Sequence, residues 1–284
     1  MPEKTGGDAV GQEVVNRHFQ QNADYWNDIY YQDGVYAEIH RERSASVLRL
    51  VDALGLAPGA RILEVGCGAG LTTTALAKRG HIMEAIDSVP AMIELTRRKV
   101  EQQGLSDRVH AGVGDCHCLG YPENSFEVVI AMGVTPYLHS LPVALRELAR
   151  VLKPGGHIVI NADNRWRLNT ILHPLHSPLL VPFRHIAEGV LRSFIPRDAK
   201  QAKFASRMYS RGEFDFALAR AGFSVLHSFT LGFGPFSFLG KKLPERLGMK
   251  VHRSLQALSD RGVIAVSSTG SQYIVLGKKN PSQA

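Results

Sequence analysis

The sequence is poor in cysteine and has no long apolar run, and both absences narrow the kinds of protein that it can be. Only Cys67, Cys116 and Cys118 occur among 284 residues, so a disulfide scaffold is not expected. No run of about 18 apolar residues is present, and the first 25 residues lack an apolar block of signal-peptide length. We therefore expect a soluble, cytoplasmic protein without a transmembrane segment.

Signatures for binding metals and phosphates are also missing. A Cys-His-Cys run at residues 116–118 has no second Cys/His pair at zinc-finger spacing, so no metal is expected. The glycine-rich stretch EVGCGAG at residues 64–70 lacks the Lys-Ser/Thr pair that follows a triphosphate-binding loop. It also matches only two of the three glycines of the dinucleotide fingerprint, because Leu71 stands at the sixth position counted from Gly66.

Positive charge is concentrated in the C-terminal part of the chain, although the net charge is only +7. Residues 1–43 carry 4 Lys/Arg and 8 Asp/Glu, residues 44–160 carry 11 of each, and residues 161–284 carry 18 and 7. The excess of +11 in the last segment is consistent with a basic, solvated surface. An anionic substrate, an acidic lipid or RNA would explain it as well.

Strand-like and helix-like patterns alternate between residues 44 and 160. This alternation predicts a parallel sheet with helices on both faces, in which a ligand lies across the carboxyl ends of the strands. Apolar runs predict strands at residues 60–65, 81–87, 108–113, 126–131 and 157–162, and helical spacing predicts helices at 44–54, 71–78, 90–103 and 141–152.

Acidic residues lie at or just beyond the carboxyl ends of the first three predicted strands. Glu64 precedes the glycine loop, where a carboxylate would repel phosphates and suit a ligand with positive charge. Asp87 lies 21 residues beyond Gly66, about the spacing at which an acid accepts hydrogen bonds from ribose hydroxyls. Asp115 can accept a hydrogen bond from an exocyclic adenine amine. Together these positions indicate a nucleoside-like, cationic ligand, although each acid alone could be a helix cap or a turn residue.

These motifs together resemble those of class I S-adenosylmethionine-dependent methyltransferases, particularly the small-molecule group that includes the ubiquinone and menaquinone biosynthesis enzymes. The resemblance rests on EVGCGAG, the AID that ends in Asp87, the GD that ends in Asp115, the strand FEVVIAMG and the turn LKPGG. It covers residues 44–160, and AGF at 221–223 matches the start of the closing strands.

The resemblance implies a Rossmann-like α/β fold with helices on both faces of the sheet. Its seven strands would be mostly parallel in the order 3-2-1-4-5-7-6. The last strand would be antiparallel, here at residues 272–276 beside residues 224–229.

The same resemblance implies S-adenosylmethionine as the cofactor and assigns roles along the motifs. Glu64 would complement its ammonium group, Asp87 would hold the ribose hydroxyls, and Asp115 would hold the adenine amine. The other expected cofactor-binding residues are Gly66, Gly68, Gly70, Ser88, Met92, Cys116 and Met132.

Candidate acceptor-binding residues come from the N-terminal region and from the loop after residues 126–131. His139 is the candidate general base because histidine titrates near neutral pH, although a packed or solvated histidine would also suit that position. Aromatic faces near a sulfonium are electrostatically favourable, and packing of an amphipathic helix is the alternative reason for aromatic residues in the arm. The candidates for contact with the acceptor are Tyr25, Trp26, Tyr30, Tyr137 and His139.

We expect residues 1–43 to form a helical arm and residues 44–284 to form the methyltransferase domain. Lid insertions are expected at about 164–207 and 232–262, and Ser210 with Glu213 predicts a capping box at the start of the helix after the first insertion. The expected reaction is methyl transfer to an O, N or C atom of a small, hydrophobic acceptor that can carry negative charge, with no nucleic-acid partner.

An RNA or protein methyltransferase and a non-catalytic cofactor-binding protein remain alternatives. A basic amphipathic helix also leaves contact with a membrane surface open. The acceptor and the oligomeric state are not determined by the sequence.

Overall fold

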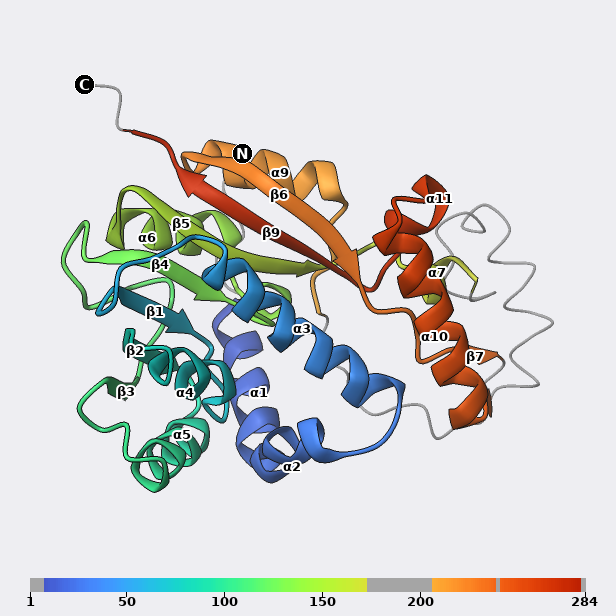
Figure 1. Cartoon of the computed structure of the whole chain (residues 1–284), viewed down its shortest axis with the longest axis horizontal. Coiled ribbons are helices and arrows are strands. Elements are labelled where there is room, and N and C mark those ends of the chain that lie inside the picture. Colours follow the sequence, from blue (N-terminus) through green and yellow to red (C-terminus); the bar gives the residue numbers. More distant parts are fainter. Residues whose placement is uncertain (1–7, 173–205, 239–240, 282–284) are drawn as a thin grey trace.

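The computed structural model describes residues 8–172, 206–238 and 241–281. Its main feature is a seven-stranded sheet with the order β3-β2-β1-β4-β5-β9-β6 (Figure 1). Strands β1 to β5 are parallel, and β9 runs antiparallel to both β5 and β6. The order and the antiparallel last strand that the resemblance implied are therefore confirmed. The strands are β1 (Arg61–Val65), β2 (Ile82–Asp87), β3 (Val109–Val113), β4 (Phe126–Ala131), β5 (Leu152–Asp163), β6 (Phe223–Leu231) and β9 (Gln272–Lys279).

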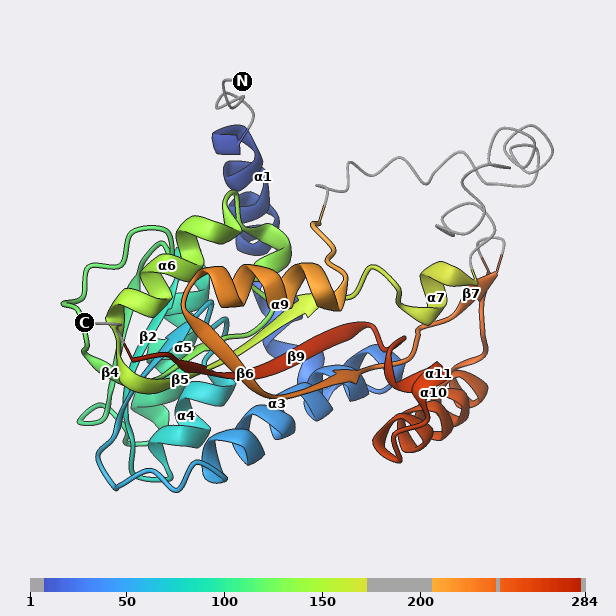
Figure 2. The ribbon, with the colours of Figure 1, turned by 90° about the horizontal axis from the view of Figure 1, so that it is seen from above.

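The central strands form because their apolar residues are covered on both faces. In β4, Val128, Val129 and Ile130 are fully buried, as expected for a near-continuous apolar run inside a parallel sheet. Helices α6 (Leu141–Val151) and α9 (Arg211–Arg220) contribute to the core on one face. On the other face lie α3 (Val35–Asp52), α4 (Leu71–Ala77) and α5 (Pro90–Gln102), and Figure 2 shows both layers.

Local signals explain where several helices begin. Pro90 stands in the first turn of α5, where its missing N–H costs nothing. The predicted capping box is present at the start of α9, because Ser210 and Glu213 each accept a hydrogen bond from the other's backbone N–H. Helix α3 begins at Val35, nine residues before the predicted start, because Gly34 adopts a positive φ of 117° at its N-terminal end.

Elements from both ends of the chain surround the carboxyl edge of the sheet. Helices α1 (Asp8–Gln21) and α2 (Ala23–Asp28) precede α3, and the short helix α7 (Leu168–Ile171) follows β5. Helix α10 (Glu245–Asp260) is fastened to α3: Glu245 accepts a hydrogen bond from the Val35 N–H at 3.0 Å, and Arg253 pairs with Glu38 at 2.9 Å. The remaining elements are η1 (Ile29–Tyr31), η2 (Thr135–Tyr137), β7 (Ser237–Phe238), β8 (Lys241–Lys242) and α11 (Ile264–Ser267).

Within the described residues, no helix combines the length and the apolar character that a bilayer crossing requires. The expected insertion at 164–207 lies largely outside these residues, since 173–205 are not described. The described part of the second expected insertion comprises β7, β8 and α10, with residues 239–240 not described.

Candidate active site

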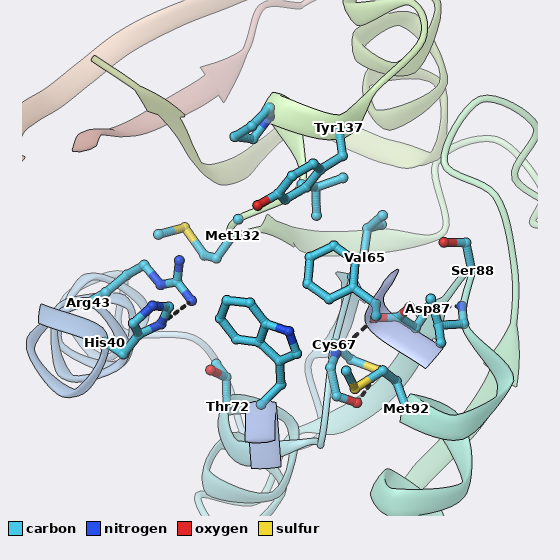
Figure 3. Close-up of a pocket in the computed structure, with 18 of the residues that line it drawn as sticks. His40, Arg43, Val65, Cys67, Thr72, Asp87, Ser88, Met92, Met132 and Tyr137 are labelled. Carbon is cyan, nitrogen blue, oxygen red and sulfur yellow. Dashed lines mark hydrogen bonds between the residues drawn. The ribbon is translucent and has the colours of Figure 1, made fainter. Parts of the chain in front are cut away.

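A cavity of about 610 Å³ lies at the carboxyl ends of β1, β2, β3, β4 and β5. The glycine loop after β1 and the segments after β2 and β3 line one part of it. Helices α1, α2 and α3 line the opposite side, so the N-terminal helices cover the strand ends. Figure 3 shows Asp87, Ser88 and Met92 on one side of this space and His40 and Arg43 on the other.

The glycine loop places backbone rather than side chains against the cavity. Gly68 lines the cavity with φ of 54°, and a Cβ atom added there would meet no other atom within 4 Å. Its N–H donates to Asp87 Oδ2 at 3.0 Å, which fixes the loop to the end of β2. A Cβ on Gly66 would instead collide with the side chain of Val134. The loop therefore leaves room for a ligand at Gly68 and requires glycine for packing at Gly66.

Glu64 is a buried acid at the wall of the cavity. It is only 4% exposed, and its carboxylate accepts a hydrogen bond from the Thr73 hydroxyl. Burial raises the pKa of Glu64 to about 7, with a smaller contribution from the charge of Asp87, while the Thr73 hydrogen bond opposes the shift. A cationic group bound beside it would restore its negative charge.

Asp87 ends β2 and is held by the backbone. Its Oδ1 accepts from the Val89 N–H at 2.9 Å, and its Oδ2 accepts from Gly68. Burial raises the pKa of Asp87, and these backbone hydrogen bonds oppose the shift. Each carboxylate oxygen has a further lone pair, so Asp87 can accept hydrogen bonds from two neighbouring hydroxyls of a ligand.

The segment after β3 combines Asp115 with His117. The Nδ1 of His117 lies 2.6 Å from Asp115 Oδ1, and its Nε2 accepts a hydrogen bond from the Ser140 N–H. Burial lowers the pKa of His117, so the neutral ring carries its proton on Nδ1 and donates to Asp115. Partial burial opposes ionisation of Asp115, but hydrogen bonds from His117 lower its pKa overall.

This histidine geometry also bears on metal binding. Within the described residues, potential ligand atoms of Asp115, Cys116 and His117 lie within 4.8 Å of one another. Both nitrogens of His117 are already used, one as a donor and one as an acceptor, so the ring presents no free lone pair to a metal. The cluster is therefore arranged to fix the loop that follows β3.

Most of the expected site residues meet at the cavity, and three do not. Gly70 lies behind the loop, where an added Cβ would lie 2.8 Å from Thr96 Cγ2. Tyr25 is 44% exposed on the arm. His139 stacks on His117 with ring centroids 3.5 Å apart and does not line the cavity. The expected residues that do line it are Glu64, Gly66, Gly68, Asp87, Ser88, Met92, Asp115, Cys116, Met132, Trp26, Tyr30 and Tyr137.

Helix α3 adds residues that the sequence analysis did not identify. The guanidinium of Arg43 lies against Gly133, since a Cβ added there would be 3.1 Å from Arg43 Nη1. Its Nη2 lies 3.0 Å from Nδ1 of His40, and burial lowers the pKa of His40 to about 2, so this ring is neutral and accepts from Arg43. Tyr36, His40, Arg43 and Val47 follow helical spacing, which was a signal available in the sequence.

The end of β5 supplies a second group of unexpected residues. Asp163, Arg167 and Asn169 line the cavity on the side away from the glycine loop. Asp163 directly follows the predicted strand 157–162, and Asp87 ends the predicted strand 81–87, so the same pattern of an acid at a strand end could have identified Asp163.

Comparison with known proteins gives the family. A family model described as a methyltransferase domain matches residues 63–160. A ubiquinone biosynthesis O-methyltransferase from Methylocella silvestris is 31% identical over 179 residues, which cover 57% of this chain and 68% of that protein. The chain belongs to the S-adenosylmethionine-dependent methyltransferases.

Other known proteins match this methyltransferase over a smaller share of their own length, or share only its fold. Malonyl-(acyl-carrier protein) O-methyltransferase from Halorhodospira halophila is 31% identical over 54% of this chain and 50% of that protein. The chain spans about half of the length of this and other relatives that it matches. Magnesium protoporphyrin IX methyltransferase from Synechocystis with bound SAH shares the fold, with a TM-score of 0.61 at 16% identity over 95% of this chain and 100% of that chain.

S-adenosylmethionine is the cofactor of the methyltransferase, and the cavity residues fit it. The open space at Gly68 admits the ligand against the backbone, and Asp87 offers acceptors at the end of β2. Buried Glu64 complements an ammonium group. Among the described residues that line the cavity there is no lysine, in agreement with a ligand that carries no phosphate.

Proposed function

We propose that the methyltransferase acts on a small acceptor molecule that enters the part of the cavity beyond the glycine loop. The observation that supports this is the enclosed, aromatic wall of the cavity. Trp26, Tyr36 and Tyr137 line it together with Met132, and the volume of about 610 Å³ lies in the range of small-molecule sites.

Two groups of residues divide the cavity. On the cofactor side, Glu64, Asp87 and Asp115 bind ammonium, hydroxyl and amine groups, and Met92 packs beside them. The acceptor side extends from Met132 to Asp163 and is covered by α2 and α3. This division brings an acceptor against the cofactor at the end of β4.

The bound cofactor supplies an activated methyl group on a sulfonium. The protein then has to align the attacking atom and keep water away, and an enclosed apolar wall serves both purposes. Phe19 of α1 contacts Tyr137 across the cavity, with ring centroids 5.2 Å apart, which favours a closed site during the reaction.

The relatives support a small-molecule acceptor. They include O-methyltransferases of ubiquinone biosynthesis and ajmaline N-methyltransferase from Rauvolfia serpentina. Helices of the N-terminal region contribute to the lining of the cavity, which suits a molecule small enough to lie between them and the strand ends. A hydrophobic and anionic acceptor agrees with the aromatic wall and with the two guanidinium groups of Arg43 and Arg167.

The fold by itself does not establish methyl transfer. The 4+2 cyclase SpnF shares it, with a TM-score of 0.59 at 18% identity over 96% of this chain and 97% of that chain. The test must therefore measure the transferred group.

Calorimetry with S-adenosylhomocysteine and with NAD gives the first test, and we expect binding of the former only. Mass spectrometry of candidate acceptors should then show the gain of one methyl group that depends on S-adenosylmethionine. Equal binding of both nucleotides, or binding of S-adenosylhomocysteine without any methylated product, would contradict the proposal. Asp107→Asn, at an exposed position away from the cavity, is the matched control for acidic variants.

A further inference from the structure

Asp163 presents a carboxylate to the acceptor side of the cavity, and within the described residues its side chain has no hydrogen-bond partner. It ends β5, next to the end of β4, and lines the cavity. Its backbone carbonyl accepts from the Tyr209 N–H, but no described residue donates to its side chain. A largely buried carboxylate normally receives hydrogen bonds, so the vacant acceptors of Asp163 are suited to a ligand.

Asn169 provides a second acceptor that has no hydrogen-bond partner among the described residues, in the same wall of the cavity. Its Oδ1 is buried and has no hydrogen-bond partner among the described residues, and the residue lines the same cavity. Both vacant groups on this segment are acceptors, whereas the unpaired buried Nε1 of Trp26, on the arm, is a donor. A ligand that forms hydrogen bonds with both Asp163 and Asn169 must therefore carry O–H or N–H donors.

The surrounding charges distinguish a hydroxyl from an amine. The guanidinium groups of Arg167 and Arg43 act on Asp163, and the charges of these three described side chains sum to +1. An amine that is protonated at neutral pH would be repelled. A neutral or anionic molecule with a hydroxyl group would not.

The titratable neighbours do not compete with Asp163 for the role of base. Burial raises the pKa of Asp163, opposed by Arg167 and Arg43. The phenols of Tyr36 and Tyr137 face it from α3 and η2, and burial raises their pKa values, so they stay protonated at neutral pH. His40, the remaining titratable group on that side of α3, is neutral and already accepts from Arg43.

We propose that Asp163 is the general base for a hydroxyl acceptor and that Asn169 holds a second donor group of the same molecule. This rests on the proposed function and narrows it to O-methylation. The acceptor oxygen forms a bond with the methyl carbon, the carbon–sulfur bond breaks, and its electron pair stays on sulfur. The proton of the hydroxyl passes to Asp163, which later returns it to water.

The attacked atom can be identified without knowing the acceptor. A metabolite extract is incubated with the protein and S-adenosylmethionine carrying a ¹³C-methyl group, and the ¹³C chemical shift of the transferred methyl is measured. We expect an O-methyl signal. A label on carbon or nitrogen would overturn the O-methylation proposal and leave methyl transfer intact, whereas no labelled product would overturn methyl transfer and with it the role of Asp163.

Variants then test Asp163 and Asn169. The substrate is the unmethylated form of the product that the labelling experiment identifies. Asp163→Asn should lower turnover by about 100-fold or more and keep the dissociation constant of S-adenosylhomocysteine within about 2-fold, with Asp107→Asn as the control. The wild-type rate should fall as pH drops below the pKa of Asp163, and this limb should be absent in Asp163→Asn.

Asn169→Ala separates binding from proton transfer. It should raise KM by about 10-fold and change turnover by less than about 3-fold, because it removes one hydrogen bond and no base. Activity of Asp163→Asn within 10-fold of the wild type, with an unchanged pH profile, would overturn the assignment. Normal binding of S-adenosylhomocysteine serves as the check that each variant is folded.

Discussion

At the scale of single residues, four acids at the ends of four strands differ in chemistry because their surroundings differ. Glu64 is buried beside a single hydroxyl donor, so its pKa rises to about 7. Asp87 is also buried, but two backbone N–H groups bind it. Asp115 is half-exposed and paired with His117, which lowers its pKa. Asp163 has guanidinium neighbours and no hydrogen-bond donor among the described residues, which leaves its oxygens for a ligand.

Asp87→Ala tests the cofactor side. If Asp87 accepts hydrogen bonds from the ribose hydroxyls as predicted, the substitution removes both acceptors and binding of S-adenosylmethionine should weaken by roughly 1 to 3 kcal/mol. The loop contact from Gly68 is lost as well, and circular dichroism with thermal unfolding checks that the fold is kept. Calorimetry measures the affinity, and an unchanged value in the folded variant would refute the assignment.

His139→Ala tests the base that the sequence suggested. Because His139 stacks outside the cavity on His117, we expect turnover to fall by less than about 10-fold, with the same pH profile as the wild type. The comparison with Asp163→Asn decides between the two residues. A loss of about 100-fold in His139→Ala, together with loss of an ionisation near pH 6 to 7, would restore the histidine as the base.

At the scale of elements, helix α1 contacts both the segment after β2 and the segment after β4. Asn16 accepts a hydrogen bond from the Ser88 hydroxyl at 3.0 Å, beside the cofactor loops, and Phe19 contacts Tyr137, after β4. Helix α3 has a comparable double role. Its residues Val35 and Glu38 hold α10, and Arg43 reaches the cavity.

Phe19→Ala tests the cover formed by α1. Removing this ring eliminates the contact with Tyr137 and part of the packing against Trp26, so S-adenosylhomocysteine should dissociate about 10-fold faster, which corresponds to about 1.4 kcal/mol. Stopped-flow fluorescence measures the rate. Val14→Ala, at an exposed position on the same helix, should leave it unchanged, and equal rates in all three proteins would contradict a covering role.

At the scale of the whole molecule, the buried acid makes stability depend on pH. The pKa of Glu64 is about 7 in the folded protein against an ordinary value of 4.5, so the native state binds more protons between these values. Stability of the ligand-free protein therefore falls as pH rises from 4.5 to 7. A bound ammonium group reverses the effect, because it stabilises the ionised form.

Glu64→Gln tests whether the protonation of Glu64 makes stability depend on pH, because glutamine keeps the shape of the protonated acid and cannot ionise. At pH 8 without ligand, Tm of the variant should exceed that of the wild type by a few degrees, and at pH 5 the two should agree. S-adenosylhomocysteine should stabilise the wild type more than the variant at pH 8. Glu123→Gln, on the surface, is the control, and an equal Tm difference at both pH values would count against the buried charge.

The sequence by itself determined the sheet and the cofactor side of the site. Apolar runs, glycines and strand-end acids act within a few residues, and the parallel strands bring the ends of β1, β2 and β3 to one edge whatever surrounds them. The elements between residues 60 and 152 accordingly lie close to their predicted bounds. Helix α6 was predicted to end at residue 152 and ends at Val151, because β5 already begins at Leu152.

Only the tertiary structure decided the acceptor side. Arg43 and Asp163 are 120 positions apart, and no local pattern states that α3 crosses the end of β5. His139 and Tyr25 have side chains suited to the site, but neither lines the cavity: His139 stacks on His117, and Tyr25 is exposed. A strand-end position is fixed by hydrogen bonds along the sheet, whereas the direction of a loop side chain depends on which distant helix covers it.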